Sequence, residues 1–233
     1  MTTFVWSGDA MSNVDRSGLY YPTITGIAET RFIEALWPQV FDEEIRLGNL
    51  HYHTGCARFD EVLFIAAITR HLNPEFIFEI GTCEGRTTVN MARNSPRLTT
   101  LFTLNLPEEN VTDIRFLPQD KLIYEQSKAR IGGRFRNSPY EDKIQQIFAD
   151  SDTYKFEGHS PIDLVLVDGG TAYETVLKGS QQCWNILRPG GVIIWRAYNY
   201  ADGVTRGVDS FCKRNGVKAF NIYKTTLAVA WKC

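Results

Sequence analysis

The residues best suited to chemistry lie at the end of the mainly apolar run 76–80 and form the pattern Glu79-x-Gly81-x-x-x-Gly85. Gly81 has no Cβ, so the chain can turn sharply there and bring its backbone close to a ligand. Gly85 precedes an expected helix, whose first N–H groups would point into the same space. We therefore expect a ligand pocket at the end of this strand, with Glu79, Gly81, Thr82, Gly85 and Thr87 as binding residues.

The spacing of these glycines narrows the choice of ligand. It is neither the G-x-G-x-x-G of dinucleotide folds nor the G-x-x-x-x-G-K-[ST] of phosphate loops, and no lysine follows to neutralise a triphosphate. This turn can bind a single anion at the helix start, and an acid stands beside it. That combination suits a ligand that ends in an amino acid, such as S-adenosylmethionine, because its carboxylate can meet the helix start and its ammonium can lie near the acid. The motif taken alone leaves a second interpretation open, in which the glycines only make a tight connection.

These residues need a scaffold that brings strand ends together. Strands are expected at 76–80, 99–104, 143–148, 162–167 and 192–195, with helical patterns between them. Two further short strands, 220–223 and 227–231, close the chain as a hairpin. This alternation predicts an α/β domain with a doubly wound, mostly parallel sheet and helices on both faces.

The chain divides into two unequal parts. Residues 1–56 are aromatic and rich in turn-forming residues, and they predict an N-terminal helical arm or cap with a helix within 31–46. Residues 57–233 form the sheet domain. The long connection 106–141 contains an expected helix near 121–131, and such insertions are commonly lids over a binding site.

Polar residues follow three further strands. Asn105 ends the second strand, Asp150 and Ser151 end the third, and Asp168 ends the fourth. In a parallel sheet these ends meet at the edge where ligands bind. A carboxylate after a buried strand is costly without a partner, so Asp168 is a strong candidate. Turn or helix-cap roles for these residues stay open.

Five segments in order, 79–88, 101–107, 150–151, 167–173 and 187–195, resemble class I S-adenosylmethionine-dependent methyltransferases. The chain is most similar to the small group related to metal-dependent O-methyltransferases, and the resemblance covers roughly 73–233. It implies a Rossmann-like, seven-stranded sheet in the order 3-2-1-4-5-7-6 and S-adenosylmethionine as cofactor. It also implies that Asn105 meets the ribose, that Asp150 and Ser151 meet the adenine, and that Asp168 lies beside the methionine part.

The chain departs from that family where metal ligands and bases are expected. Thr171 stands where relatives commonly carry histidine, and Arg196-Ala197 stands where they often carry His-Asp or Asp-Asp. Only Asp168 and Asn199 remain as oxygen ligands, so no metal site is expected. Arg196 would bind an acidic substrate or pair with Asp168, and a solvated arginine is the alternative. Asp168 and Arg196 are the catalytic candidates, and His51 or His53 could reach the pocket as a base.

We therefore expect methyl transfer to a small-molecule acceptor, most simply at oxygen. The alternative is a degenerate protein that binds S-adenosylmethionine without turnover and serves a partner or regulatory role. A nicotinamide-dependent oxidoreductase is disfavoured because the dinucleotide fingerprint is missing.

The composition limits the kinds of partner that we expect for this chain. The 233 residues carry a net charge of −2, which implies no nucleic acid partner. No apolar run could span a membrane, and residues 1–6 lack the order of a signal peptide. The five cysteines are scattered, as expected for reduced thiols in a cytoplasmic protein. The sequence leaves a homodimer open.

Overall fold

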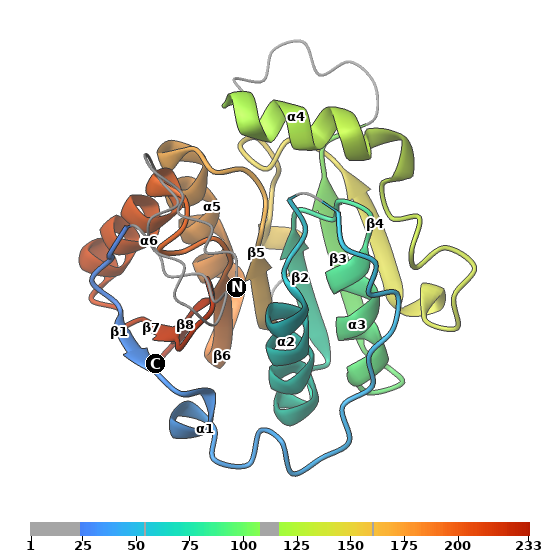
Figure 1. Cartoon of the computed structure of the whole chain (residues 1–233), viewed down its shortest axis with the longest axis horizontal. Helices are drawn as coiled ribbons and strands as arrows, with labels where there is room; N and C mark the ends of the chain where they lie inside the picture. The colour runs from blue at the N-terminus through green and yellow to red at the C-terminus, as the bar shows by residue number, and fades with distance from the viewer. Residues whose placement is uncertain (1–23, 54, 108–116, 160) are drawn as a thin grey trace, which may run out of the picture.

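The computed structural model describes residues 24–53, 55–107, 117–159 and 161–233. Within these ranges, eight strands form one open sheet in the order β1-β7-β8-β6-β5-β2-β3-β4 (Figure 1). The strands from β2 to β6 pair in parallel, whereas β8 runs antiparallel to β6 and β7. Their bounds are β1 Glu29–Arg31, β2 Phe76–Ile80, β3 Thr100–Asn105, β4 Ile144–Phe148, β5 Ile162–Val167, β6 Leu187–Trp195, β7 Phe220–Ile222 and β8 Ala228–Trp231.

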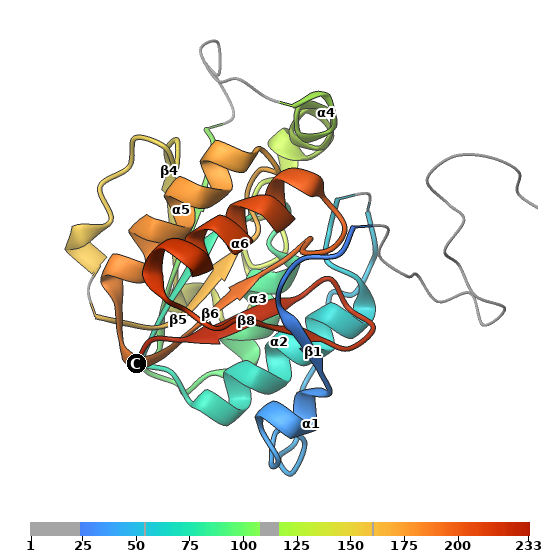
Figure 2. The ribbon, with the colours of Figure 1, turned by 90° about the vertical axis from the view of Figure 1, so that its left-hand side faces the viewer.

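The strand order confirms the expected Rossmann-like topology and corrects its strand count. With β2 taken as the first strand, the seven strands after β1 follow the order 3-2-1-4-5-7-6. The eighth strand, β1, comes from the arm and pairs in parallel with β7, with Glu29 opposite Phe220. Figure 2 shows this segment in blue beside the C-terminal strands. It covers an edge whose backbone groups would otherwise be free to pair with another chain.

The helices cover both faces of the sheet, as the alternation predicts (Figures 1 and 2). Helices α2 and α3 pack together, and so do α5 and α6. Their bounds are α2 Phe59–Leu72, α3 Arg86–Asn94, α5 Tyr173–Ile186 and α6 Asp202–Asn215, and short 3₁₀ turns lie at Glu141–Lys143 and Glu157–His159. None of the described helices combines the length and apolar character needed to cross a bilayer.

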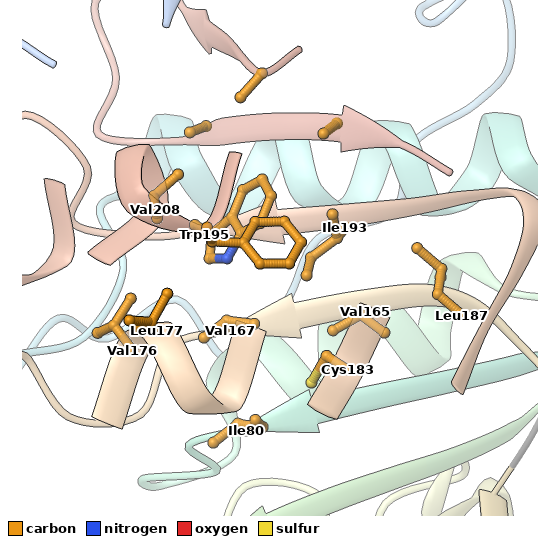
Figure 3. Packing of buried hydrophobic residues seen from close by; sticks show 14 of the residues in the cluster. Ile80, Val165, Val167, Val176, Leu177, Cys183, Leu187, Ile193, Trp195 and Val208 are labelled. Carbon is orange, nitrogen blue, oxygen red and sulfur yellow. The ribbon is translucent and has the colours of Figure 1, made fainter. Parts of the chain in front are cut away.

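The two faces hold two apolar clusters because successive strand residues point to opposite sides. On β5, Val165 belongs to the cluster beneath α5 and α6, and Leu164 belongs to the cluster beneath α2 and α3. Figure 3 shows the first cluster, where Trp195 and Val165 lie among side chains of α5 and β6. The Trp195 indole is fully buried, and its N–H donates to the Ser180 hydroxyl at 2.9 Å. The two faces together hold the strand ends in fixed positions.

The arm contains less helix than expected. The helix predicted within 31–46 shrinks to α1, Ile33–Leu36, and the chain then continues through turns and irregular structure. Pro38 explains the early end, since proline disfavours helical geometry in the residue before it and lacks a backbone N–H. Trp37 instead packs on Trp231 of β8, with ring centroids 4.8 Å apart. Residues 1–23 of the predicted arm lie outside the described residues.

The insertion lies across the carboxyl ends of the strands. Its helix α4, Pro118–Ser127, continues into a 3₁₀ turn at Lys128–Arg130, so the expected helix begins three residues earlier than predicted. Pro118 occupies the first turn, where a missing N–H costs nothing. Figure 1 shows α4 above the ends of β2 and β3. Residues 108–116 of the predicted lid lie outside the described ranges.

Candidate functional site

A cavity of about 570 Å³ opens at the carboxyl edge of the sheet, beneath α4. Its size is typical of pockets for small ligands and cofactors. The ends of five strands contribute to its wall, through Ile80, Leu104, Ala149, Val167 and Trp195 and the residues that follow them. This is the edge at which open parallel sheets bind ligands.

The glycine turn after β2 forms one side of the cavity. Gly81 has a φ of +98°, and a Cβ there would lie 2.4 Å from the carbonyl oxygen of Asp168. Glycine is therefore required for two strand ends to approach each other. Gly85, with a φ of +85°, precedes the first residue of α3 and packs against Phe135 of the insertion. The Asn105 side chain holds the turn, because its Oδ1 accepts the Cys83 N–H at 3.1 Å.

Asp150 and Ser151 line the far end of the cavity, after β4. The Asp150 Oδ1 accepts the backbone N–H of Asp152 at 2.8 Å, which shapes the turn. Burial and the neighbouring Asp150 raise the pKa of Asp152. The expected residues of the third strand end are thus in the wall, and part of the Asp150 carboxylate is used by the turn itself.

Asp168 and Arg196 form an ion pair between the ends of β5 and β6. The Arg196 Nε donates to Asp168 Oδ1, and its Nη2 donates to the Gly55 carbonyl at 2.7 Å. Burial raises the pKa of Asp168 to about 6, and the charge of Arg196 opposes the rise. The buried carboxylate of Glu61 adds negative charge near Arg196, and the carboxylates together raise the pKa of Arg196. Asp168 is therefore mostly ionised at neutral pH and held in place by Arg196.

A family model described as a methyltransferase domain matches residues 78–196, just over half of the chain. The matched segment runs from β2 to the end of β6, and so includes all five strands that line the cavity. The chain belongs to this methyltransferase family. No curated protein matches the chain.

Solved structures share the fold of this methyltransferase at low identity. The O-methyltransferase TomG from Streptomyces achromogenes, in complex with SAM, is 17% identical with a TM-score of 0.54, over 88% of this chain and 92% of that one. An O-methyltransferase from Bacillus cereus in complex with SAH is 15% identical with a TM-score of 0.56, over 85% and 97%. SAH-bound PaMTH1 from Podospora anserina is 13% identical with a TM-score of 0.55, over 77% and 81%.

The structure brings most of the predicted site residues to one cavity. Gly81, Thr82, Thr87, Asn105, Asp150, Ser151, Asp168 and Arg196 line it. Glu79 and Gly85 do not, and their contact with a cofactor stays a prediction. His51 and His53 are also absent from the cavity wall, and His53 Nε2 lies 3.5 Å from the Glu84 carboxylate instead.

Glu79 lies beneath the glycine turn and is fully buried. Its Oε2 accepts the hydroxyls of Thr88 at 2.5 Å and Thr103 at 2.6 Å. The Thr103 hydroxyl also lies 2.7 Å from that of Thr82, which lines the cavity. Burial raises the pKa of Glu79 to about 8, so the side chain is mostly protonated at neutral pH. Glu79 thus supports the turn through the two threonines.

Two features of the cavity wall were not predicted from the sequence. Asp120 of α4 accepts the N–H of Thr171 at 2.8 Å and its hydroxyl at 2.9 Å, which joins α4 to the loop after β5. Cys56 and Cys83 meet in the wall with their sulfur atoms 3.9 Å apart. The hydrogen bond with Cys83 lowers the pKa of Cys56 to about 7, and Arg86 contributes. Neither feature could be predicted from local patterns, because each joins segments that are distant in the sequence. The sequence does show an acid in the insertion, Asp120, and a cysteine in the glycine turn, Cys83, which mark one partner of each contact.

The ends of β5 and β6 do not present the oxygen ligands that a divalent ion would need. Arg196 places a positive charge on Asp168, and Ala197 offers no ligand atom. The Asn199 Oδ1 accepts the Gly26 N–H at 2.7 Å, and the side chain is absent from the cavity wall. Among the described residues, no group of three His, Cys, Asp or Glu side chains is arranged to hold a metal.

Proposed function

We propose that this methyltransferase moves a methyl group from S-adenosylmethionine to an oxygen atom of a small-molecule acceptor, without a bound divalent metal. The observation that carries the proposal is the wall of the cavity. It presents the bare backbone at Gly81, the amide of Asn105 and the carboxylates of Asp150 and Asp168, each at a strand end. Membership of the methyltransferase family supports the reaction type.

The residues present fit S-adenosylmethionine. Gly81 lets the ends of β2 and β5 meet at the cavity wall, and the first N–H groups of α3 carry no side-chain cap. Asn105 would meet the ribose hydroxyls, and Asp150 and Ser151 would accept from and donate to the adenine. Related solved structures are described with SAM or SAH.

The cofactor supplies an electrophilic methyl group on a sulfonium, so the protein has mainly to position the acceptor. Holding the two reacting atoms about 3–3.5 Å apart accounts for much of the acceleration in such reactions. Asp168 would accept the proton of the acceptor hydroxyl, since its pKa of about 6 lies near neutral pH. Arg196 would keep that carboxylate oriented, and α4 would exclude water.

Metal independence is part of the proposal because of the charge on Arg196. A guanidinium bound to Asp168 repels a dication by several kcal/mol at 4–6 Å and an effective dielectric of about 20. Of the two oxygen ligands expected from the sequence, Asp168 and Asn199, Asp168 alone is a carboxylate. A metal ion would therefore have to displace Arg196 from Asp168. No step of the proposed reaction passes through a metal.

Calorimetry with S-adenosylmethionine and S-adenosylhomocysteine (SAH) tests cofactor binding. We expect binding to the wild type, a weaker affinity in Asn105→Ala, and wild-type affinity in the control Asn215→Ala at the end of α6. No heat and no thermal shift at millimolar ligand would contradict the proposal. Mass spectrometry of a metabolite extract incubated with protein and cofactor then tests turnover, and binding without any methylated product would favour the degenerate alternative.

A further inference from the structure

Cys56 and Cys83 face each other in the wall of the cavity. They lie 27 positions apart in the chain, yet their sulfur atoms are 3.9 Å apart. Among the described residues that line the cavity, they are the two thiols. Cys183 and Cys212 are part of the apolar cluster beneath α5 and α6, and Cys233 is exposed. A small molecule in the cavity would therefore meet Cys56 and Cys83 together.

The turn after β2 holds Cys83 in an unusual conformation. Its φ of +48° lies in the left-handed region, which a residue with a Cβ rarely adopts. Its N–H donates to Asn105 Oδ1 at 3.1 Å, and its carbonyl accepts the N–H of Gly132 at 3.0 Å. Strained residues of this kind cluster at functional sites, where the surrounding structure holds them in place. At Cys83 the strained turn holds a thiol against Cys56.

The electrostatics of the wall make the two thiols unequal. The hydrogen bond with Cys83 and the charge of Arg86 lower the pKa of Cys56 to about 7, against burial and the charges of Asp168 and Glu84. The hydrogen bond with Cys56 and burial raise the pKa of Cys83. A thiolate is the nucleophile in disulfide exchange, so Cys56 is the attacking sulfur and Cys83 is the second to react.

We propose that Cys56 and Cys83 form a redox site of the cavity, at which a small disulfide such as oxidised glutathione is reduced while an intramolecular disulfide forms. The Cys56 thiolate attacks one sulfur of the oxidant, breaks its S–S bond and releases one glutathione thiolate. The Cys83 thiol then loses its proton to that thiolate or to water, attacks the Cys56 sulfur and releases the second glutathione. The two cysteines lose two electrons and two protons, and the oxidant gains them as two thiols.

The new bond would change the cavity wall. A disulfide needs its sulfur atoms about 2.05 Å apart, so the two segments have to approach by roughly 1.9 Å. Next to Cys56, the Gly55 carbonyl accepts from Arg196 at 2.7 Å, and Asn105 holds Cys83. A movement of either segment disturbs one of these contacts. The oxidised protein should therefore bind SAH about 2–10-fold more weakly, the effect of one lost hydrogen bond. This consequence rests on the proposed function, whereas the disulfide itself does not.

Peptide mapping after treatment with oxidised glutathione tests the bond. Once unreacted thiols are blocked, trypsin places Cys56 in peptide 47–58 and Cys83 in peptide 71–86. We expect the two peptides to be joined within a single chain and to separate again in dithiothreitol. Cys233→Ser is the control, because it removes the exposed thiol and should leave the joined pair unchanged. Absence of the joined peptides, or a bond that forms only between two chains, overturns the proposal.

Two serine variants test the order of the steps. In Cys83→Ser, one glutathionyl group should stay on Cys56, because the thiol that would displace it is missing. In Cys56→Ser, Cys83 should take up glutathione at least about tenfold more slowly, because its thiolate form is scarce. Faster uptake at Cys83 than at Cys56 would overturn the assigned roles. The peptide map of the wild type decides the bond even if a variant does not fold.

Calorimetry with SAH on the reduced and the oxidised wild type tests the effect on the cavity. We expect the weaker affinity of the oxidised protein to return to its original value in dithiothreitol. Equal affinity in both states would overturn the link between the disulfide and the cofactor site. A reduced protein that binds no SAH contradicts the proposed function instead, and the peptide map still decides the disulfide in that case.

Discussion

Replacing Glu79 with glutamine should change how the stability of the protein depends on pH. Glu79 is fully buried, and its Oε1 has no hydrogen-bond partner among the described residues. Burial raises its pKa from 4.5 to about 8 in the folded protein. In the unfolded chain the carboxyl ionises at its ordinary pKa, so the unfolded state releases a proton that the folded state keeps.

The sign and size follow from this difference. Stability contributed by the neutral carboxyl is fully present below pH 4.5, falls as the pH rises, and is lost once the pH passes 8. Each pH unit in that window costs about 1.4 kcal/mol, so the whole window costs about 5 kcal/mol. Glutamine has no proton to lose. The free energy of unfolding of Glu79→Gln minus that of the wild type should therefore rise by about 5 kcal/mol from pH 4.5 to pH 8.5.

Urea unfolding of both proteins at several pH values measures this difference, and subtraction cancels the other titrating groups. Glu75→Gln, at an exposed position just before β2, is the matched control, because water solvates that carboxylate in both states. Parallel pH profiles for Glu79→Gln and the wild type would refute the argument that Glu79 is held neutral. SAH affinity in the same variant decides whether Glu79 meets the cofactor, since an unchanged affinity shows that it does not.

Three further predictions concern the cavity. The rate at which iodoacetamide modifies Cys56, measured over a pH series, should have its midpoint near the Cys56 pKa of about 7, and SAH should protect the thiol; a midpoint near 8.5, as for an ordinary thiol, or no protection would contradict this. Asp120→Ala should weaken the attachment of α4 to the loop after β5 by about 1–3 kcal/mol, and so speed both SAH dissociation and tryptic cleavage of the insertion. Glu125→Ala, on the exposed side of α4, should change neither rate. Equal cleavage in both variants would show that Asp120 does not hold α4 in place. A chelator should leave SAH affinity and any activity unchanged, and activity lost with chelator and restored by magnesium would show that Asp168 binds a metal after all.

Local patterns in the sequence were enough to predict the sheet and most of the cavity wall. The strands β2 and β5 begin and end where their apolar runs do, because a buried parallel strand needs apolar side chains on both faces. Gly81 was expected to allow a close approach, and the structure shows what approaches it: the Asp168 carbonyl. Strand ends meet at one edge by topology, so residues at those ends were predicted together without knowledge of any contact.

What the sequence left open was decided by contacts between distant segments. Arg196 could have bound substrate, paired with Asp168 or faced water, and only the register of β5 and β6 placed it on Asp168. The pairing of β1 with β7 joins segments about 190 positions apart, and no local pattern specifies such a partner. Glu79 follows the motif expected of a ligand contact, yet the pleat of β2 turns its side chain beneath the glycine turn, between Thr88 and Thr103. Residues at strand ends can be located from local patterns alone, whereas the direction of each side chain and the partner that it meets depend on tertiary packing.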